Sequence, residues 1–210
     1  MLNYSLNRNR TILFSILAMA TVYVIYTEFV FFTDQHSDLT HYNAMRWLLI
    51  PHGLFGMVAL LLGPFQFSTT LRKKNIKLHK SIGKTYIITI LLAAPFAVLL
   101  NIYYRIPGAT ITFVFENITQ ALVWAITALL AWIAAYRGQI TIHKMWAARS
   151  YGLTMVFVLS RIDNPMRLFI PKPDINDFGH FLWFLIVVAL IIPDVLVFSK
   201  ELLGNKKVKK

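Results

Sequence analysis

Three histidines lie within or at the start of apolar stretches, where an ionisable side chain is costly unless it has a partner or a function. Two of them, His79 and His143, each follow a basic loop in the similar triplets Leu-His-Lys and Ile-His-Lys. If both triplets open membrane helices on one side, the two imidazoles lie at one depth. Two imidazoles from neighbouring helices are the axial ligands of a six-coordinate haem b. They could equally hold a divalent metal ion or a quinone head group, or bond to loop carbonyls and lipid phosphate.

Small residues follow these histidines at helical spacing. On the predicted second helix the stripe consists of His52, Gly56, Ala59 and Gly63. Such a stripe either lets helices pack closely or leaves a flat slot for a cofactor, and close packing is the more common outcome. In the haem interpretation, Gly83 and Ala147 make room for the porphyrin one turn beyond His79 and His143. His52 would then serve a separate outer site or an electron exit.

Two further groups of polar residues are candidates for sites. Arg149 and Asp194 are each expected one or two turns inside the cytoplasmic end of a helix, and opposite charges at similar depth neutralise each other. We therefore predict a structural ion pair, with a proton relay as the alternative. On the outer side, carboxylates and imidazoles that could hold zinc or copper are Asp34, His36, Asp38, His41 and His180. His180 could instead pair with His52.

The elements that position these residues are predicted to be membrane helices. The chain is 57% hydrophobic and only 14% charged, and a helix needs about 20 apolar residues to cross the hydrocarbon layer. Six stretches qualify, near Thr11–Phe32, Met45–Phe67, Ile82–Tyr103, Asn117–Tyr136, Met145–Ile162 and Phe178–Phe198. We expect the first to be an uncleaved anchor. The prediction is an all-α, polytopic membrane helical bundle, a single integral membrane domain over 1–210, with a four-helix core from spans two to five.

Basic residues predict the orientation of the six spans. Lys and Arg number 21 against nine Asp and Glu. Only five of these basic residues fall in the loops that follow odd-numbered spans, namely Arg46, Arg105, Arg161, Arg167 and Lys172. The other sixteen fall at the termini and in the loops that follow even-numbered spans. Because basic loops stay inside, we predict cytoplasmic termini in a cell membrane, with the basic face against anionic lipid rather than nucleic acid. The chain has no cysteine, which excludes disulfides, iron–sulfur clusters and covalently attached haem c.

A combination of motifs between 46 and 161 is specific enough to suggest a family. The motifs are Pro51-His52-Gly53-Leu54-Phe55-Gly56, Leu62-Gly63-Pro64-Phe65-Gln66-Phe67, Leu78-His79-Lys80 with Gly83 and Tyr86, and Ile142-His143-Lys144-Met145-Trp146 with Arg149-Ser150-Tyr151. The chain resembles a family of bacterial membrane proteins known as a domain of unknown function, DUF2306. The resemblance implies no activity. It implies that the family's motif residues are His52, Gln66, His79, His143 and Arg149.

A looser resemblance is to the dihaem b-type transmembrane cytochromes. Their histidines also open helices in His-x-x-x-Gly contexts, as His52 and His79 do here. The chain departs from that pattern because its predicted fourth span, Asn117–Tyr136, contains no histidine. This likeness therefore implies one haem at most, between His79 and His143.

Three functions remain open at this point. The first is a haem b-binding electron-transfer protein that uses His79 and His143 as iron ligands. The second is a small-molecule, lipid or quinone carrier whose polar path is lined by His52, Gln66, Arg149 and Asp194. The third is a membrane assembly subunit without chemistry of its own. No phosphate-binding loop or catalytic triad pattern assigns an enzyme class.

Overall fold

The computed structural model describes residues 40–104, 106, 108–161 and 175–203, with scattered positions between 15 and 26. Every regular element in these ranges is an α-helix, which confirms the predicted all-α class. The helices are α2 (Thr40–Gln66), α3 (Thr69–Lys74), α4 (Ile76–Tyr103), α5 (Ile111–Tyr136), α6 (Ile140–Arg161) and α7 (Ile175–Leu203).

Four segments of these helices are long and apolar enough to cross a membrane: Ala44–Gln66, Ile76–Tyr103, Ile111–Tyr136 and Asn176–Pro193. They match the predicted second, third, fourth and sixth spans. The predicted fifth span lies in α6, which does not reach the same apolarity because it carries His143, Lys144 and Arg149. Most of the predicted first span lies outside the described residues.

α6 tolerates polar residues because it packs against protein. It contacts both α5 and α7 and, less extensively, α2. Its Ser150 and Thr154 are buried among these helices. By contrast, large apolar side chains on the outer faces of the other helices are exposed, for example Leu61, Leu92, Ile126 and Val187. Lipid is the solvent that suits such a surface.

A short helix, α3, turns the chain between α2 and α4. The Ser68 hydroxyl accepts a hydrogen bond from Leu71 N at 3.2 Å, and the Asn75 side chain accepts one from Leu78 N at 2.9 Å. These caps satisfy amides at the starts of α3 and α4 that have no partner within the helix. α4 consequently begins at Ile76, six residues before the predicted Ile82, and His79 is inside its first turn.

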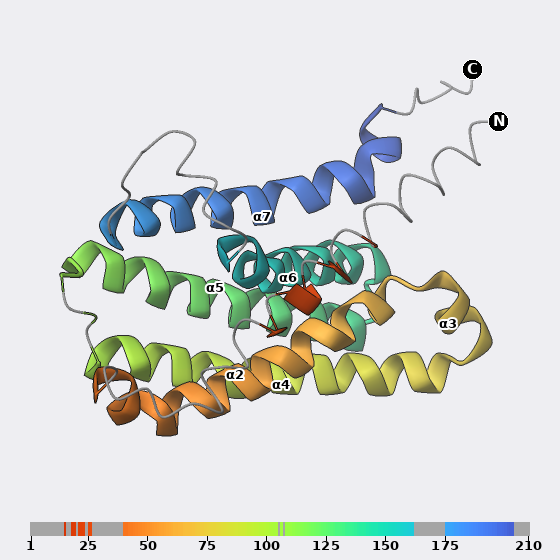
Figure 1. Ribbon diagram of the computed structural model, residues 1–210. Helices are drawn as coiled ribbons and strands as arrows, with labels where there is room; N and C mark the ends of the chain where they lie inside the picture. The colour runs from red at the N-terminus through yellow and green to blue at the C-terminus, as the bar shows by residue number, and fades with distance from the viewer. Residues whose placement is uncertain are drawn as a thin grey trace, which may run out of the picture.

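The long helices lie side by side, with α7 along α5 and α6 and with α2 beside α4 (Figure 1). Because one helix separates α4 from α6 in the chain, these two run in the same direction and begin at the same end of the bundle. α5 and α7 run the other way and begin at the opposite end. At that end, Thr110 N donates a hydrogen bond to Asn176 Oδ1 at 3.0 Å.

The buried core involves more helices than the predicted four. It combines α2, α4, α5 and α6 with the α7 residues Leu182, Leu185, Ile186 and Ala189. α7 approaches α6 closely at Gly152, where a Cβ atom would lie 2.5 Å from the Ala189 carbonyl oxygen. Backbone-to-backbone proximity of this kind requires a glycine. The sequence pattern did not indicate it because the contact joins residues far apart in the chain.

Candidate functional site

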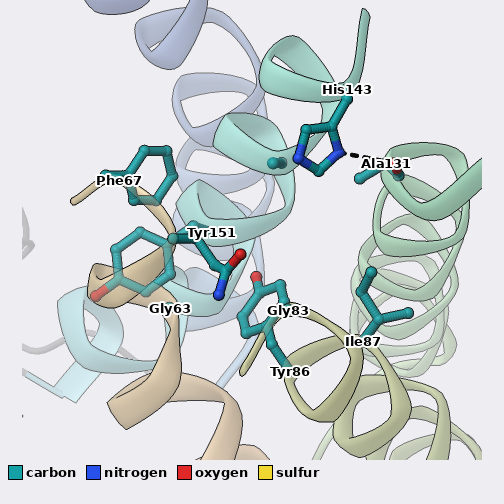
Figure 2. Close-up of a pocket in the computed structure, with 10 residues that line it drawn as sticks. Gly63, Phe67, Gly83, Tyr86, Ile87, Ala131, His143 and Tyr151 are labelled. Atoms are coloured by element: carbon teal, nitrogen blue, oxygen red, sulfur yellow. Dashed lines mark hydrogen bonds between the residues drawn. The ribbon is translucent and has the colours of Figure 1, made fainter. Parts of the chain in front are cut away.

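A small cavity of about 30 Å³ lies where α2 ends and α4 and α6 begin. Its lining residues are Gly63, Gln66, Phe67, Gly83, Tyr86, Ile87, Ala131, His143, Ala147 and Tyr151. Figure 2 shows the His143 ring at one side of this space and the rings of Tyr151 and Phe67 at another. These two aromatic rings pack with their centroids 5.6 Å apart. A cavity of this volume holds one or two water molecules.

The two helices that carry the paired histidines are in matching register. His79 and His143 are each the fourth residue of their helix. Tyr86 follows His79 at the same spacing as Ser150 follows His143, and the Tyr86 hydroxyl lies 3.0 Å from the Ser150 hydroxyl. His79 also interacts electrostatically with His143. The structure therefore places the two imidazoles at one end of the bundle and at similar depth, with His143 in the cavity lining and His79 outside it.

Hydrogen bonds fix the form of one imidazole. His143 Nδ1 lies 2.9 Å from the carbonyl oxygen of Ala131, which can only accept. Nδ1 must therefore carry the hydrogen, so in the neutral ring Nε2 keeps its lone pair. A backbone carbonyl bound to the far ring nitrogen is the usual support of a metal-ligating histidine. His79 Nδ1, in contrast, is buried without a hydrogen-bond partner.

A buried network of hydroxyl groups lies next to the cavity and includes Tyr86 of its lining. Besides Ser150, the Tyr86 hydroxyl contacts Thr154 Oγ1 at 3.1 Å. Trp124 Nε1 donates to the same Thr154 oxygen at 2.9 Å, and Thr154 donates to the Ser150 carbonyl at 3.0 Å. Networks with every member bonded hold their helices in one arrangement. This network ties α4, α5 and α6 together about two turns beyond the histidines.

The glycines next to the cavity are in close contact with neighbouring side chains. A Cβ atom at Gly63 would collide with the Tyr151 ring, and one at Gly83 would lie 2.9 Å from Gln66 Oε1. Gln66 Nε2 is itself buried without a hydrogen-bond partner. Close packing is thus what these small residues provide in this arrangement. A porphyrin enters the same space only if the Gln66 and Tyr151 side chains turn away.

His52 and Arg149 lie apart from this cavity lining. The His52 Nδ1 atom is 3.0 Å from the Ala93 carbonyl oxygen, across α2 and α4. His52 precedes Gln66 on α2 by about 21 Å of helix rise. The Arg149 guanidinium lies over the Trp146 ring, 4.7 Å from its centroid. The side chain of Asp194 lies outside the described residues, so the ion pair with Arg149 stays a prediction.

A second site, at the opposite end, was not predicted from the sequence. Glu116 on α5 is 1% exposed, and its Oε1 atom lies 3.6 Å from Nδ1 of His180 on α7. The signal that could have revealed it is the single carboxylate within the apolar helix Ile111–Tyr136. His180 was predicted in an outer cluster with Asp34, His36, Asp38 and His41. The first three of these lie outside the described residues, and so does the side chain of His41. Within the described residues, no three His, Asp or Glu side chains are grouped to hold a metal ion.

A bundle of apolar helices that enclose buried polar groups defines a polytopic integral membrane protein. The family model described as predicted membrane protein (DUF2306) matches residues 49–198, and the chain belongs to this family. The match spans most of α2 and α7 and all helices between them, so it includes both ends described above. No curated protein and no solved structure matches the chain significantly.

Proposed function

We propose that this chain binds haem b between His79 and His143 near the cytoplasmic face and acts in membrane electron transfer. The observation that carries the proposal is the pair of imidazoles at one depth on two helices in register. His143 is oriented by its hydrogen bond to Ala131, which leaves Nε2 available as a ligand. A pair of neutral histidines is the donor set of a six-coordinate b-type haem.

His79 and His143 fit a haem b as nitrogen ligands, and the side chains one turn beyond them are small. Gly83 and Ala147 follow the two histidines by one helical turn. Lys80 and Lys144 are exposed beside them and suit the propionate groups. Gln66 and Tyr151 would have to swing out of the space that they fill. When bound, the haem would supply one-electron redox chemistry, and the protein would ligate it and limit access of water.

The charge distribution supports six spans with both termini in the cytoplasm of a cell membrane. Basic side chains gather at the end where α4 and α6 begin, namely Arg72, Lys73, Lys74, Lys77, Lys80, Arg137 and Lys144. Among the side chains that the structure describes, both acidic ones, Glu116 and Asp177, lie at the other end. Positive loops remain cytoplasmic and attract anionic lipid head groups. The histidine end then faces the cytoplasm.

An absorption spectrum of detergent-solubilised protein from haem-replete cells tests the proposal. We expect a Soret band that is lost in His79→Ala and in His143→Ala. His180→Ala, at the opposite end, and His52→Ala, at another level of α2, are matched controls and should keep the band. A colourless wild-type protein would overturn the proposal, as would a band that survives both ligand substitutions.

A second candidate, a carrier for a quinone or another small head group, rests on a different observation. Gln66 Nε2 and His79 Nδ1 are buried without partners, and the cavity is small. A head group with carbonyl acceptors would satisfy both nitrogens. Binding of a short-chain quinone to the purified protein should weaken about tenfold in Gln66→Leu. A tenfold change corresponds to about 1.4 kcal/mol of binding free energy. Unchanged binding in that variant would exclude this role for Gln66.

A further inference from the structure

The buried carboxylate of Glu116 is not used by the proposed haem site. Glu116 is the sixth residue of α5, at the end of the bundle opposite to the paired histidines. Its side chain is 1% exposed, and neither carboxylate oxygen has a hydrogen-bond partner. An ionised carboxylate buried without partners costs several kcal/mol, more than a stable membrane helix normally bears without a functional reason.

The protein is shaped around this carboxylate by a glycine of the facing helix. A Cβ atom at Gly179 would collide with Glu116 Oε2 and would lie 3.2 Å from the Phe113 ring. α7 therefore presents bare backbone to the carboxylate. The starts of the two helices are also joined by the packing of Phe113 on Phe178, whose ring centroids are 6.4 Å apart. Glu116 thus sits in a fixed, close-fitting position between α5 and α7.

His180 connects this position with the surface. Its Nδ1 atom is 3.6 Å from Glu116 Oε1, while 70% of its side chain is exposed. The distance is beyond that of a hydrogen bond, and a small movement or one bridging water closes it. The Trp183 indole lies within reach of the same carboxylate. A proton can therefore pass between solution and a buried acid through one exposed imidazole.

Charge balance limits the states of this pair. Glu116 can be neutral beside a neutral imidazole, or ionised beside an imidazolium, and in both arrangements the pair holds one proton. Among described charged groups, His180 is the one that acts electrostatically on the carboxylate. Asp177 precedes His180 by about one turn on α7. It takes part in another interaction and is not among the groups that act on Glu116. α5 also packs against α4 and α6, and no described charged side chain of these two helices acts electrostatically on the Glu116 carboxylate.

We propose that Glu116 and His180 form a proton-binding site that opens to the side of the membrane where α5 and α7 begin. The site takes up a second proton on acidification, when Glu116 becomes neutral beside a charged imidazole. Proton uptake at Glu116 removes the attraction to His180 and changes the contact between α5 and α7. The inference does not depend on haem, because no residue of the pair touches the cavity at the other end.

Infrared difference spectroscopy of the wild-type protein in lipid, titrated from mildly alkaline to mildly acidic pH, tests this site. We expect the carbonyl stretch of a protonated carboxyl group in a weakly hydrogen-bonded environment to appear on acidification. The stretch should be absent in Glu116→Gln, a nearly isosteric change, and unaltered in Asp177→Asn, the control at the same end of the bundle. A stretch that persists in Glu116→Gln would overturn the assignment.

His180→Ala tests the role of the imidazole, and the fold does not depend on packing of this exposed side chain. Without the cationic partner, the carboxyl group should stay protonated to a pH higher by about one unit, a tenfold change in proton affinity. Proton exchange with solution should also slow. A titration midpoint identical to that of the wild type would overturn the pairing.

Discussion

At the end where α4 and α6 begin, the buried polar atoms without hydrogen bonds are nitrogens, Gln66 Nε2 and His79 Nδ1. At the end where α5 and α7 begin, they are the two carboxylate oxygens of Glu116. The first end is surrounded by basic residues, and the second contains the acidic side chains that the structure describes. A ligand that buried nitrogens can bind suits the first end, whereas a proton suits the second. The comparison shows that the buried polar atoms without hydrogen bonds are nitrogens at one end of the bundle and carboxylate oxygens at the other.

The two ends also differ in how firmly their groups are held. Beneath the histidines, the Tyr86 hydroxyl network is fully bonded, but the adjacent cavity is lined by the long side chain of Gln66. The Glu116 carboxylate, by contrast, lies directly against the backbone of α7 at Gly179, where no side chain could be added without a collision. A flexible side chain can move to admit a ligand, and backbone cannot. We therefore expect the first end to adapt and the second to resist change.

Gly179→Ala should show the largest effect. The added Cβ atom collides with the Glu116 carboxylate and also lies 3.2 Å from the Phe113 ring, so α7 must shift or both side chains must move, at a cost of about 2–3 kcal/mol. The thermal unfolding midpoint in detergent should fall clearly. Gly83→Ala, at the other end, meets only the tip of Gln66 and should change the midpoint little, since alanine also favours the helix. Equal effects of the two substitutions would contradict the difference in rigidity.

Glu116→Met should stabilise the protein by about 2 kcal/mol. The substitution replaces a buried carboxylate without hydrogen bonds by an apolar side chain of similar volume. The expected readout is a raised unfolding midpoint at neutral pH, with a smaller gain in acid, where the wild-type carboxyl group is neutral. A lowered midpoint at neutral pH would mean that the carboxylate has partners that stabilise the fold.

Tyr86→Phe should destabilise the protein by about 1–2 kcal/mol. It removes the hydroxyl group that contacts both Ser150 and Thr154 while it keeps the ring in the core. Unfolding of this variant should be compared with that of Tyr103→Phe, whose side chain is exposed at the end of α4. If the two variants unfold alike, the network does not form the rigid floor of the histidine end.

Gln66→Met should have the smallest effect, a stabilisation of about 1 kcal/mol in protein without a bound ligand. The change removes the buried Nε2 atom that lacks a partner and leaves the volume next to Gly83 filled. The unfolding midpoint should rise slightly while binding of a short-chain quinone weakens. A variant that gains stability and keeps full ligand content would place Gln66 outside the binding site.

Several features of the fold and the site could be predicted from single segments of the sequence. The lengths of the apolar stretches predicted the four spans that the structure supports, because crossing the hydrocarbon layer sets a minimum length. The similar triplets around His79 and His143 predicted two equivalent helix starts, and both residues are fourth in their helices. The contact of Arg149 with Trp146, three residues earlier, is also local.

Other features depend on residues that are distant in the chain. The pairing of Glu116 with His180 and the contact of Gly152 with Ala189 each join separate helices. Apolarity is similar all around a membrane helix, so the sequence does not indicate which face meets which neighbour. For the same reason the part of α7 in the core and the filling of the glycine slots by Gln66 and Tyr151 were not predicted.

The sequence by itself determined that this protein is an all-helical membrane bundle with histidines at two basic helix starts, since hydropathy, helix length and local charge are properties of continuous segments. Only the tertiary structure decided which polar atoms are left without partners, and at which end of the bundle. Hydrogen bonds and close packing between helices depend on relative rotation and depth. Those quantities are set by the contacts of the whole bundle and not by any one helix.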